Sequence, residues 1–286
     1  METMSYVISF LEKIVNIPSP SGYTRRVLRE VEEEASRLGY TSFYNRKGGL
    51  IIEVPGKSKK VLGLSAHVDT LGAMVRSITP KGMLTMVPVG SFMMETVEGI
   101  YCKIHTRTGK TYTGTVLTKE PSVHTYDDAR TLERKAKNME VRLDEAVDSA
   151  DDVRRLEISS GDYISFDPMF VHTESGFIKS RHLDDKASVA VLMGVLRDIS
   201  QSGKMPERTL KIVISNYEEV GFGASWIPED IEEFIAVDMG AAIRGGHNIR
   251  GALIGQGVHA SHGTERTHEK GLEQTLKLIE GYIELE

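Results

Sequence analysis

The chain is poor in cysteine, in excess positive charge and in long apolar runs. Cys102 is the only cysteine among 286 residues, which excludes an intrachain disulfide and agrees with a reducing compartment. The net charge of −6 provides no basic surface for nucleic acid, so we expect no nucleic-acid partner. Residues 1–16 mix charged and apolar positions without the uninterrupted apolar stretch of a signal peptide or membrane span. We therefore predict a cytoplasmic protein with no membrane partner.

Several catalytic motifs are also lacking. No Gly-x-Ser-x-Gly segment occurs, and the lone Cys102 falls in a predicted β run, which disfavours serine and cysteine hydrolases. Gly56-Lys57-Ser58 resembles the end of a phosphate-binding loop, but Ile51 occupies the position where that motif needs glycine. The chemistry has to come from other residue types.

The sequence alternates helical and strand patterns. Apolar spacing predicts two opening helices and further helices at residues 187–196 and 272–285. Strands alternate with these helices, which predicts an α/β fold with a mostly parallel sheet and helices on both faces. Short apolar runs place the strands at 50–54, 61–64, 210–214, 234–237 and 250–254.

The middle of the chain departs from this alternation. Short β-like runs at 83–89, 100–106 and 112–116 are separated by glycine and proline turns. Ser149, shortly before two aspartates, resembles the N-cap of a short helix. We predict one α/β domain, residues 1–73 and 178–286, interrupted by a smaller β-rich domain, residues 74–177.

Acidic and histidine residues gather where the predicted strands end. His67, the pair Glu218 and Glu219, and Asp238 each come after a predicted strand, and Asp184 precedes a predicted helix. Each segment alone is weak evidence for a metal site, because acidic pairs such as Glu218 and Glu219 usually lie in solvated turns. Ligand sites in open α/β sheets gather at the carboxyl ends of strands, where buried carboxylates are costly unless a cation compensates them. Together the residues predict a two-metal hydrolase site.

The histidines allow more than one ligand set. His67 and Asp69 are two residues apart and share one face of an extended strand. Asp69 is then expected to accept the ring N–H of His67, which fixes the tautomer that binds metal. On composition alone, His259, His262 and His268 are all candidates for a further imidazole ligand.

Five segments resemble, in order, the motifs of the tetrahedral-type cytosolic metallo-aminopeptidases, the glutamyl and leucyl aminopeptidase family. The resemblance implies a two-metal α/β peptidase domain interrupted by a β dimerisation domain, with dimers assembling into a twelve-subunit shell. It also implies two divalent metal ions, zinc before cobalt or manganese, and peptide substrates with a free N-terminus. The segments are 65–72, 180–188, 216–223, 236–240 and 260–268.

Carried over position by position, the resemblance implies roles for single residues. His67, Asp184 and Asp238 would hold one ion. Asp184, Glu219 and His268 would hold the other, with Asp184 bridging. Glu218 becomes the general base, and Asp69 is the second residue assigned to catalysis.

The chain departs from that family at one place. Between Ala242 and Ile243 it lacks a strand-and-helix segment that relatives carry. The lost segment would normally help to build the substrate pocket. A second hypothesis therefore stays open, a catalytically silent peptide-binding or assembly subunit of the same fold.

Overall fold

The computed structural model describes residues 2–223, 225–238 and 249–284 and forms two compact units. One unit comprises Met1–Thr70 with Pro168–Glu286, and the other is Leu71–Asp167. The sequence placed these boundaries slightly later, at 73/74 and 177/178. The segment predicted to be missing between Ala242 and Ile243 lies outside the described residues.

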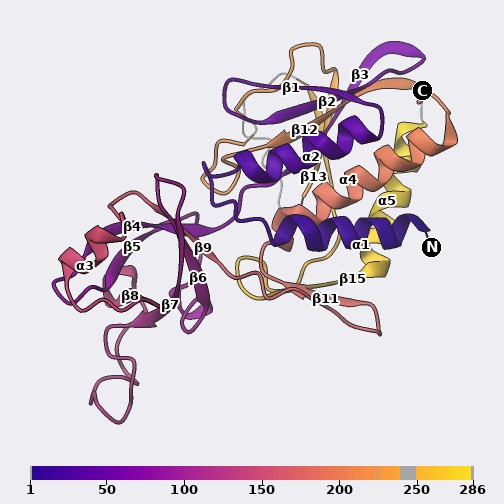
Figure 1. Cartoon of the computed structure of the whole chain (residues 1–286). Helices are drawn as coiled ribbons and strands as arrows, with labels where there is room; N and C mark the ends of the chain where they lie inside the picture. Colours follow the sequence, from indigo (N-terminus) through magenta and orange to yellow (C-terminus); the bar gives the residue numbers. More distant parts are fainter. Residues whose placement is uncertain (1, 224, 239–248, 285–286) are drawn as a thin grey trace. The chain divides into compact units, whose positions relative to one another are not determined.

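The first unit is built on a six-stranded sheet, and Figure 1 labels most of its strands. Strands β12, β3, β13 and β14 run parallel to one another, whereas β2 is antiparallel to both of its neighbours, β1 and β12. The mostly parallel sheet is therefore confirmed. In order across the sheet the strands are β1 (Thr41–Tyr44), β2 (Leu50–Val54), β12 (Arg208–Ser215), β3 (Ser58–His67), β13 (Glu233–Val237) and β14 (Arg250–Ile254).

Four helices pack on one face of this sheet. Alternate strand residues such as Leu64 and Ile212 share one large core with all four helices, because successive side chains of a strand point to opposite faces. On the other face Phe234 packs with Ile227 of the β12–β13 connection. The helices are α1 (Glu2–Val15), α2 (Arg25–Arg37), α4 (Leu183–Ser202) and α5 (Glu269–Ile283).

The prediction of helices on both faces thus differs from the structure in the part of the chain described. The connection between β12 and β13 contains Gly221, Gly223 and Pro228, and its described residues form turns in place of a helix. Glycine and proline both disfavour helix, which accounts for the difference.

A buried lysine joins two of the helices. Lys186 of α4 is fully buried, and its Nζ donates to the main-chain oxygens of Ile14 at 2.9 Å and Ile17 at 2.8 Å. Ile14 lies in the last turn of α1, where carbonyl groups have no acceptor role inside the helix, and Ile17 lies just beyond the helix. Burial lowers the pKa of Lys186 to about 7. The contact fixes the start of α4 against α1.

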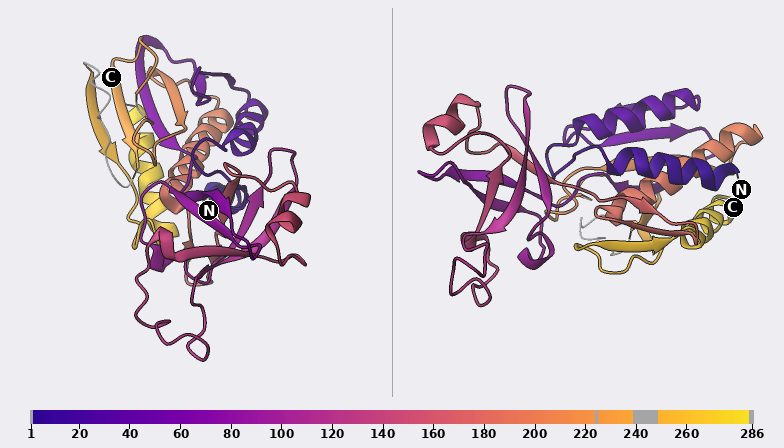
Figure 2. Two further views of the ribbon diagram at one scale, coloured as in Figure 1. Left: turned by 90° about the vertical axis from the view of Figure 1, so that its left-hand side faces the viewer. Right: turned by 60° about the horizontal axis from the view of Figure 1, so that its bottom comes forward.

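The second unit is a closed antiparallel barrel (Figure 2). Its buried apolar side chains form a core of their own. Cys102 is buried in that core. The short helix α3 (Ala150–Arg155) begins after Ser149, whose side chain accepts the N–H of Asp152, so the predicted N-cap is confirmed. In order around the barrel the strands are β4 (Gly72–Ile78), β5 (Leu84–Val89), β8 (Met139–Leu143), β7 (Thr111–Thr118), β6 (Tyr101–His105) and β9 (Tyr163–Phe166).

A small antiparallel sheet completes the first unit. It consists of β10 (Val171–His172), β11 (Phe177–Ser180) and β15 (Glu265–His268). The sequence did not predict β15, which follows His262 and ends on His268, two of the three histidine candidates. Among the described residues, no helix combines the length and apolar character that a membrane crossing requires.

Candidate metal centre

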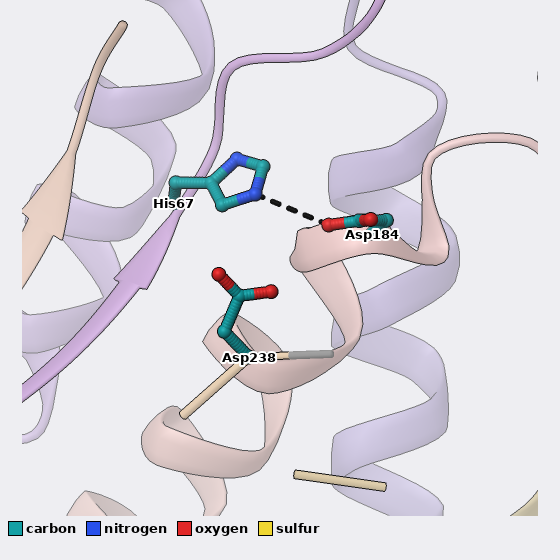
Figure 3. A group of neighbouring side chains, drawn as sticks. All are labelled: His67, Asp184 and Asp238. Atoms are coloured by element: carbon teal, nitrogen blue, oxygen red, sulfur yellow. Dashed lines mark hydrogen bonds and ion pairs between the residues drawn. The ribbon is translucent and has the colours of Figure 1, made fainter. Parts of the chain in front are cut away.

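Three side chains from distant parts of the chain meet at the end of the parallel sheet. His67 is the last residue of β3, Asp184 lies at the start of α4, and Asp238 directly follows β13. One ligand atom from each lies within 4.8 Å of the other two. Figure 3 shows the His67 ring directed at the Asp184 carboxylate, with Nε2 and Oδ1 3.2 Å apart. The predicted convergence of these three residues is present.

The orientation of His67 leaves one ring nitrogen facing the other two residues. Its Nδ1 lies 2.9 Å from the main-chain oxygen of Asp69 and 3.5 Å from the Asp69 carboxylate. The nearer partner is thus the carbonyl oxygen, where the sequence predicted the carboxylate. With Nδ1–H donating there, Nε2 carries a lone pair toward Asp184. His67 Nε2 and Asp184 Oδ1 would then both be acceptors 3.2 Å apart, which requires a cation or a proton between them.

The second oxygen of Asp184 faces a different imidazole. Asp184 Oδ2 lies 3.6 Å from His262 Nε2, and the same nitrogen lies 3.4 Å from Glu219 Oε2. Ser261 donates its hydroxyl to Asp184 Oδ2 at 2.7 Å. Asp184 therefore presents one oxygen to His67 and the other to His262, which is the arrangement a bridging carboxylate requires.

His268 is not brought into this group. Its Nε2 lies 3.0 Å from the Ser175 main-chain oxygen, and its Nδ1 accepts the N–H of Lys270 at 3.1 Å as the N-cap of α5. Its ring also contacts Phe177 edge to face at 4.8 Å between centroids. Both ring nitrogens are thus engaged elsewhere. Of the three histidines considered from the sequence, the structure brings His262 to the centre.

His259 lies outside the centre as well. Its main chain pairs with that of Arg266, and the residue is exposed. The sequence contained both His259 and His262 as candidates, but spacing alone could not separate them.

Glu218 lies at the edge of the same group and Asp69 lies beneath it. Glu218 Oε2 is 3.7 Å from His67 Nε2, and the Glu218 side chain is 28% exposed. The Asp69 carboxylate is fully buried and accepts the main-chain N–H groups of Glu218 at 3.1 Å and Glu219 at 3.2 Å. Ser21 donates its hydroxyl to the same carboxylate at 2.6 Å. Asp69 therefore fixes the turn that carries both glutamates.

The electrostatics of the centre favour a bound cation. Burial, together with repulsion from Asp184 and other neighbouring carboxylates, raises the pKa of Glu219 to about 9. Burial and repulsion from Asp238 raise the pKa of Asp185 well above its usual value. Glu219 Oε2 and Asp185 Oδ1 are buried and have no hydrogen-bond partner among the described residues. Such groups are costly unless positive charge lies beside them.

The donor set itself fits divalent metal ions. Imidazole nitrogen and carboxylate oxygen are the ligands of zinc, and they suit cobalt and manganese as well. Burial lowers the pKa of His67, but hydrogen bonds to Asp184 and Asp69 outweigh burial and raise that pKa well above its usual value. A metal ion at Nε2 would supply the positive charge that these carboxylates otherwise draw from a proton. The residues present therefore fit the ions that the sequence predicted.

The loops that carry the site contain strained residues. His182, Tyr217 and His262 adopt positive φ values of 67°, 71° and 64°, although none of them is glycine. His182 lies two residues before Asp184, and Tyr217 precedes Glu218. Non-glycine residues in this region cost about 1–3 kcal/mol each and persist where the surroundings hold them. The strain is concentrated next to the candidate ligands.

Fold and site together define an α/β protein with a candidate metal centre, in which acidic and histidine residues gather at the carboxyl ends of parallel strands. The particular family follows from comparison with known proteins. The model of the M42 glutamyl aminopeptidase family matches residues 48–245, so the chain belongs to that family.

Similar proteins extend the match to the whole chain. YhfE of Bacillus subtilis, provisionally assigned as an aminopeptidase, is 38% identical, and the alignment covers 99% of each chain. A TET aminopeptidase from a marine-sediment thaumarchaeon has the same fold, with a TM-score of 0.86 at 15% identity over 97% of this chain and 96% of that one. The TET1 peptidase of Pyrococcus horikoshii matches with a TM-score of 0.80 at 20% identity over 97% and 99%.

The alignment with YhfE also bears on the chain's length. It extends over 342 residues, more than the 286 of this chain, so YhfE carries residues that have no counterpart here.

Proposed function

We propose that this protein is an aminopeptidase that hydrolyses peptides from a free N-terminus with the help of two divalent metal ions. His67, Asp184 and Asp238 would hold the first ion, and Asp184, Glu219 and His262 the second. The observation that carries this proposal is the Asp184 carboxylate, whose two oxygens face His67 and His262 at 3.2 Å and 3.6 Å. His262 takes the place that the sequence had given to His268.

Two such ions, when bound, would acidify water and polarise the scissile carbonyl. Glu218 is the general base, which would take a proton from the attacking water and deliver it to the nitrogen of the leaving amine. Burial raises the pKa of Glu218, which makes it a better proton acceptor than an exposed glutamate. Its partial exposure leaves it open to substrate, unlike Glu219, whose side chain is 2% exposed.

Asp69 supports this chemistry without contacting the reacting atoms. It holds the main chain of Glu218 and Glu219 through two N–H bonds, so that one glutamate serves as base and the next as ligand. The Asp69 carbonyl oxygen sets the His67 tautomer that directs Nε2 toward the metal.

The assembly and cellular location belong to the same proposal. P. horikoshii TET1 can assemble into a tetrahedron or a large octahedral shell, and the fold is shared. We expect dimers of this chain to assemble into a dodecamer in the cytoplasm. Size-exclusion chromatography with light scattering measures the mass directly.

One observation favours a second candidate, a catalytically silent peptide-binding or assembly subunit. The residues that YhfE has and this chain lacks would be missing from the substrate pocket if they fall near the centre. In that case the protein would bind two ions and still fail to hydrolyse aminoacyl substrates.

The test combines metal content with turnover. The purified protein is expected to bind two zinc or cobalt ions per chain and to hydrolyse aminoacyl p-nitroanilides. Glu218→Gln should keep both ions and lose turnover by about 10²–10⁴-fold, because it removes the base and no ligand. Full turnover by this variant would remove Glu218 from the mechanism, and silence of the wild-type protein with both ions bound would favour the second candidate.

A further inference from the structure

A buried glutamate that is not a proposed ligand joins the two loops of the second metal group. Glu265 is the first residue of β15 and is 2% exposed. Its Oε2 accepts the main-chain N–H of Asp184 at 3.1 Å, and its Oε1 accepts the main-chain N–H of His262 at 3.0 Å. One carboxylate thus connects the backbone of the bridging aspartate to the backbone of the imidazole ligand.

Glu265 is itself held firmly. Its strand β15 pairs with β11, where Glu265 lies opposite Ser180. The neighbouring Arg266 exchanges two main-chain hydrogen bonds with His259, at 2.9 Å and 3.1 Å. The carboxylate therefore projects from a strand that is fixed on both sides. A rigid base of this kind is what a positioning group needs.

The turn that carries His262 needs such a support. Ala260 and His262 both have positive φ, at 58° and 64°, and the Gly263 N–H closes the turn on the Ala260 oxygen at 3.0 Å. A hydrogen bond to the His262 N–H offsets the cost of this unfavourable conformation, and without it the turn would be less stable. The bond to Glu265 is the side-chain contact that holds it.

We propose that Glu265 is a positioning residue that sets the spacing between Asp184 and His262 and thereby the affinity for the second ion. This inference rests on the proposed two-metal centre. It assigns to Glu265 no contact with substrate or metal. His67 is held separately, through its main-chain N–H to Asp185 at 3.1 Å, so the first ion depends less on Glu265.

Glu265→Gln tests the inference, because the glutamine side chain has nearly the same shape as glutamate but no charge. A glutamine offers one oxygen and one N–H₂ group, so one of the two main-chain N–H groups would face a donor. Changes in groups that orient metal ligands usually lower metal affinity 10–100-fold. We expect the second cobalt ion to bind at least about 10-fold more weakly and the first to change by less than about 3-fold. The matched control is Glu273→Gln, which changes a partly exposed glutamate of α5 that pairs with Lys277.

The experiment titrates metal-free whole protein with cobalt and follows the visible absorption bands and the heat of binding. If the wild type binds fewer than two ions, the proposed centre fails. If the wild type binds two and Glu265→Gln binds both with unchanged affinity, the role of Glu265 fails while the centre survives. Equal weakening of both ions would also overturn it, because that outcome indicates general distortion.

A second variant keeps the test decisive if Glu265→Gln does not fold. Glu265→Asp retains the charge but is one methylene shorter, so it reaches one of the two N–H groups less well. A selective loss at the second ion is expected here too, smaller than for glutamine. A folded Glu265→Asp that binds both ions as the wild type does would refute the inference.

Discussion

Replacing His262 or His268 by alanine tests which of the two histidines binds metal and which caps helix α5. His262→Ala takes away one of three protein ligands of the second ion, whereas His268→Ala takes away the N-cap of α5. The two residues lie six positions apart, and the sequence-based assignment gave the ligand role to His268. We therefore expect His262→Ala to weaken metal binding and His268→Ala to lower the stability of the fold.

The sizes of the two effects follow from the contacts. Loss of a group that merely orients a ligand costs 10–100-fold in affinity, so loss of the ligand itself should cost at least about 100-fold, or roughly 2.7 kcal/mol. Loss of an N-cap costs about 1 kcal/mol, and the edge-to-face contact with Phe177 adds about 0.5–1.5 kcal/mol. For a unit of this size that corresponds to a Tm lower by roughly 5 °C.

The assay measures both quantities on the same samples. Cobalt titration of metal-free protein should show two equivalents for wild type and His268→Ala, and one tight equivalent for His262→Ala. Thermal unfolding of metal-free protein should show the lower Tm in His268→Ala alone. If His268→Ala lost the second ion and His262→Ala kept it, the geometric assignment would be wrong.

Two further predictions concern stability. Lys186→Met keeps the side-chain volume but leaves two main-chain oxygens at the end of α1 without their buried donor, so urea unfolding should show a loss of about 2–4 kcal/mol. Glu280 has its pKa raised to about 7 by burial and by Asp198, so its contribution to stability is present below about pH 4.5 and is lost as the pH rises through 7. Glu280→Gln should remove that decline in stability. Because Glu280 is half-exposed, the free energy of unfolding of this variant at pH 8 should exceed that of the wild type by less than about 1 kcal/mol. The control Glu174→Gln changes an exposed glutamate and should leave the pH dependence unchanged.

Much of the fold was accessible from the sequence because the buried strands are short uniform apolar runs. The strands at 50–54 and 250–254 were predicted with the bounds that the structure has, and three of the six barrel strands, β5, β6 and β7, were predicted within a few residues. The helix positions followed from their spacing. Which face of the sheet each helix covers could not be predicted, because that depends on the paths of the connections.

The metal ligands at strand ends were accessible for a similar reason. His67, Glu219 and Asp238 each come within five residues of the end of an apolar run, so the strand end that positions each of them could be predicted. His262 could not be separated from His268, because the choice depends on β15, a four-residue strand with the burial pattern of alternating inward and outward residues. Strands this short carry too little periodicity to be predicted.

The acidic residues around the centre fall into two groups, those whose carboxylates face the imidazoles and those whose carboxylates accept main-chain N–H groups. Asp184, Glu219 and Asp238 direct their carboxylates toward imidazoles or toward each other. Three others bind main-chain N–H groups of the segments that carry ligands. These are Asp69 with Glu218 and Glu219, Asp185 with His67, and Glu265 with Asp184 and His262.

Each of these three supporting carboxylates joins two segments of the centre. Asp69 connects the end of β3 to the turn after β12, Asp185 connects the start of α4 to β3, and Glu265 connects β15 to the start of α4. N–H donors stabilise a carboxylate without any cation, so a supporting acid keeps its role when metal is absent. The segments that hold the ligands are thus fixed to one another before an ion arrives, and binding need not first order them.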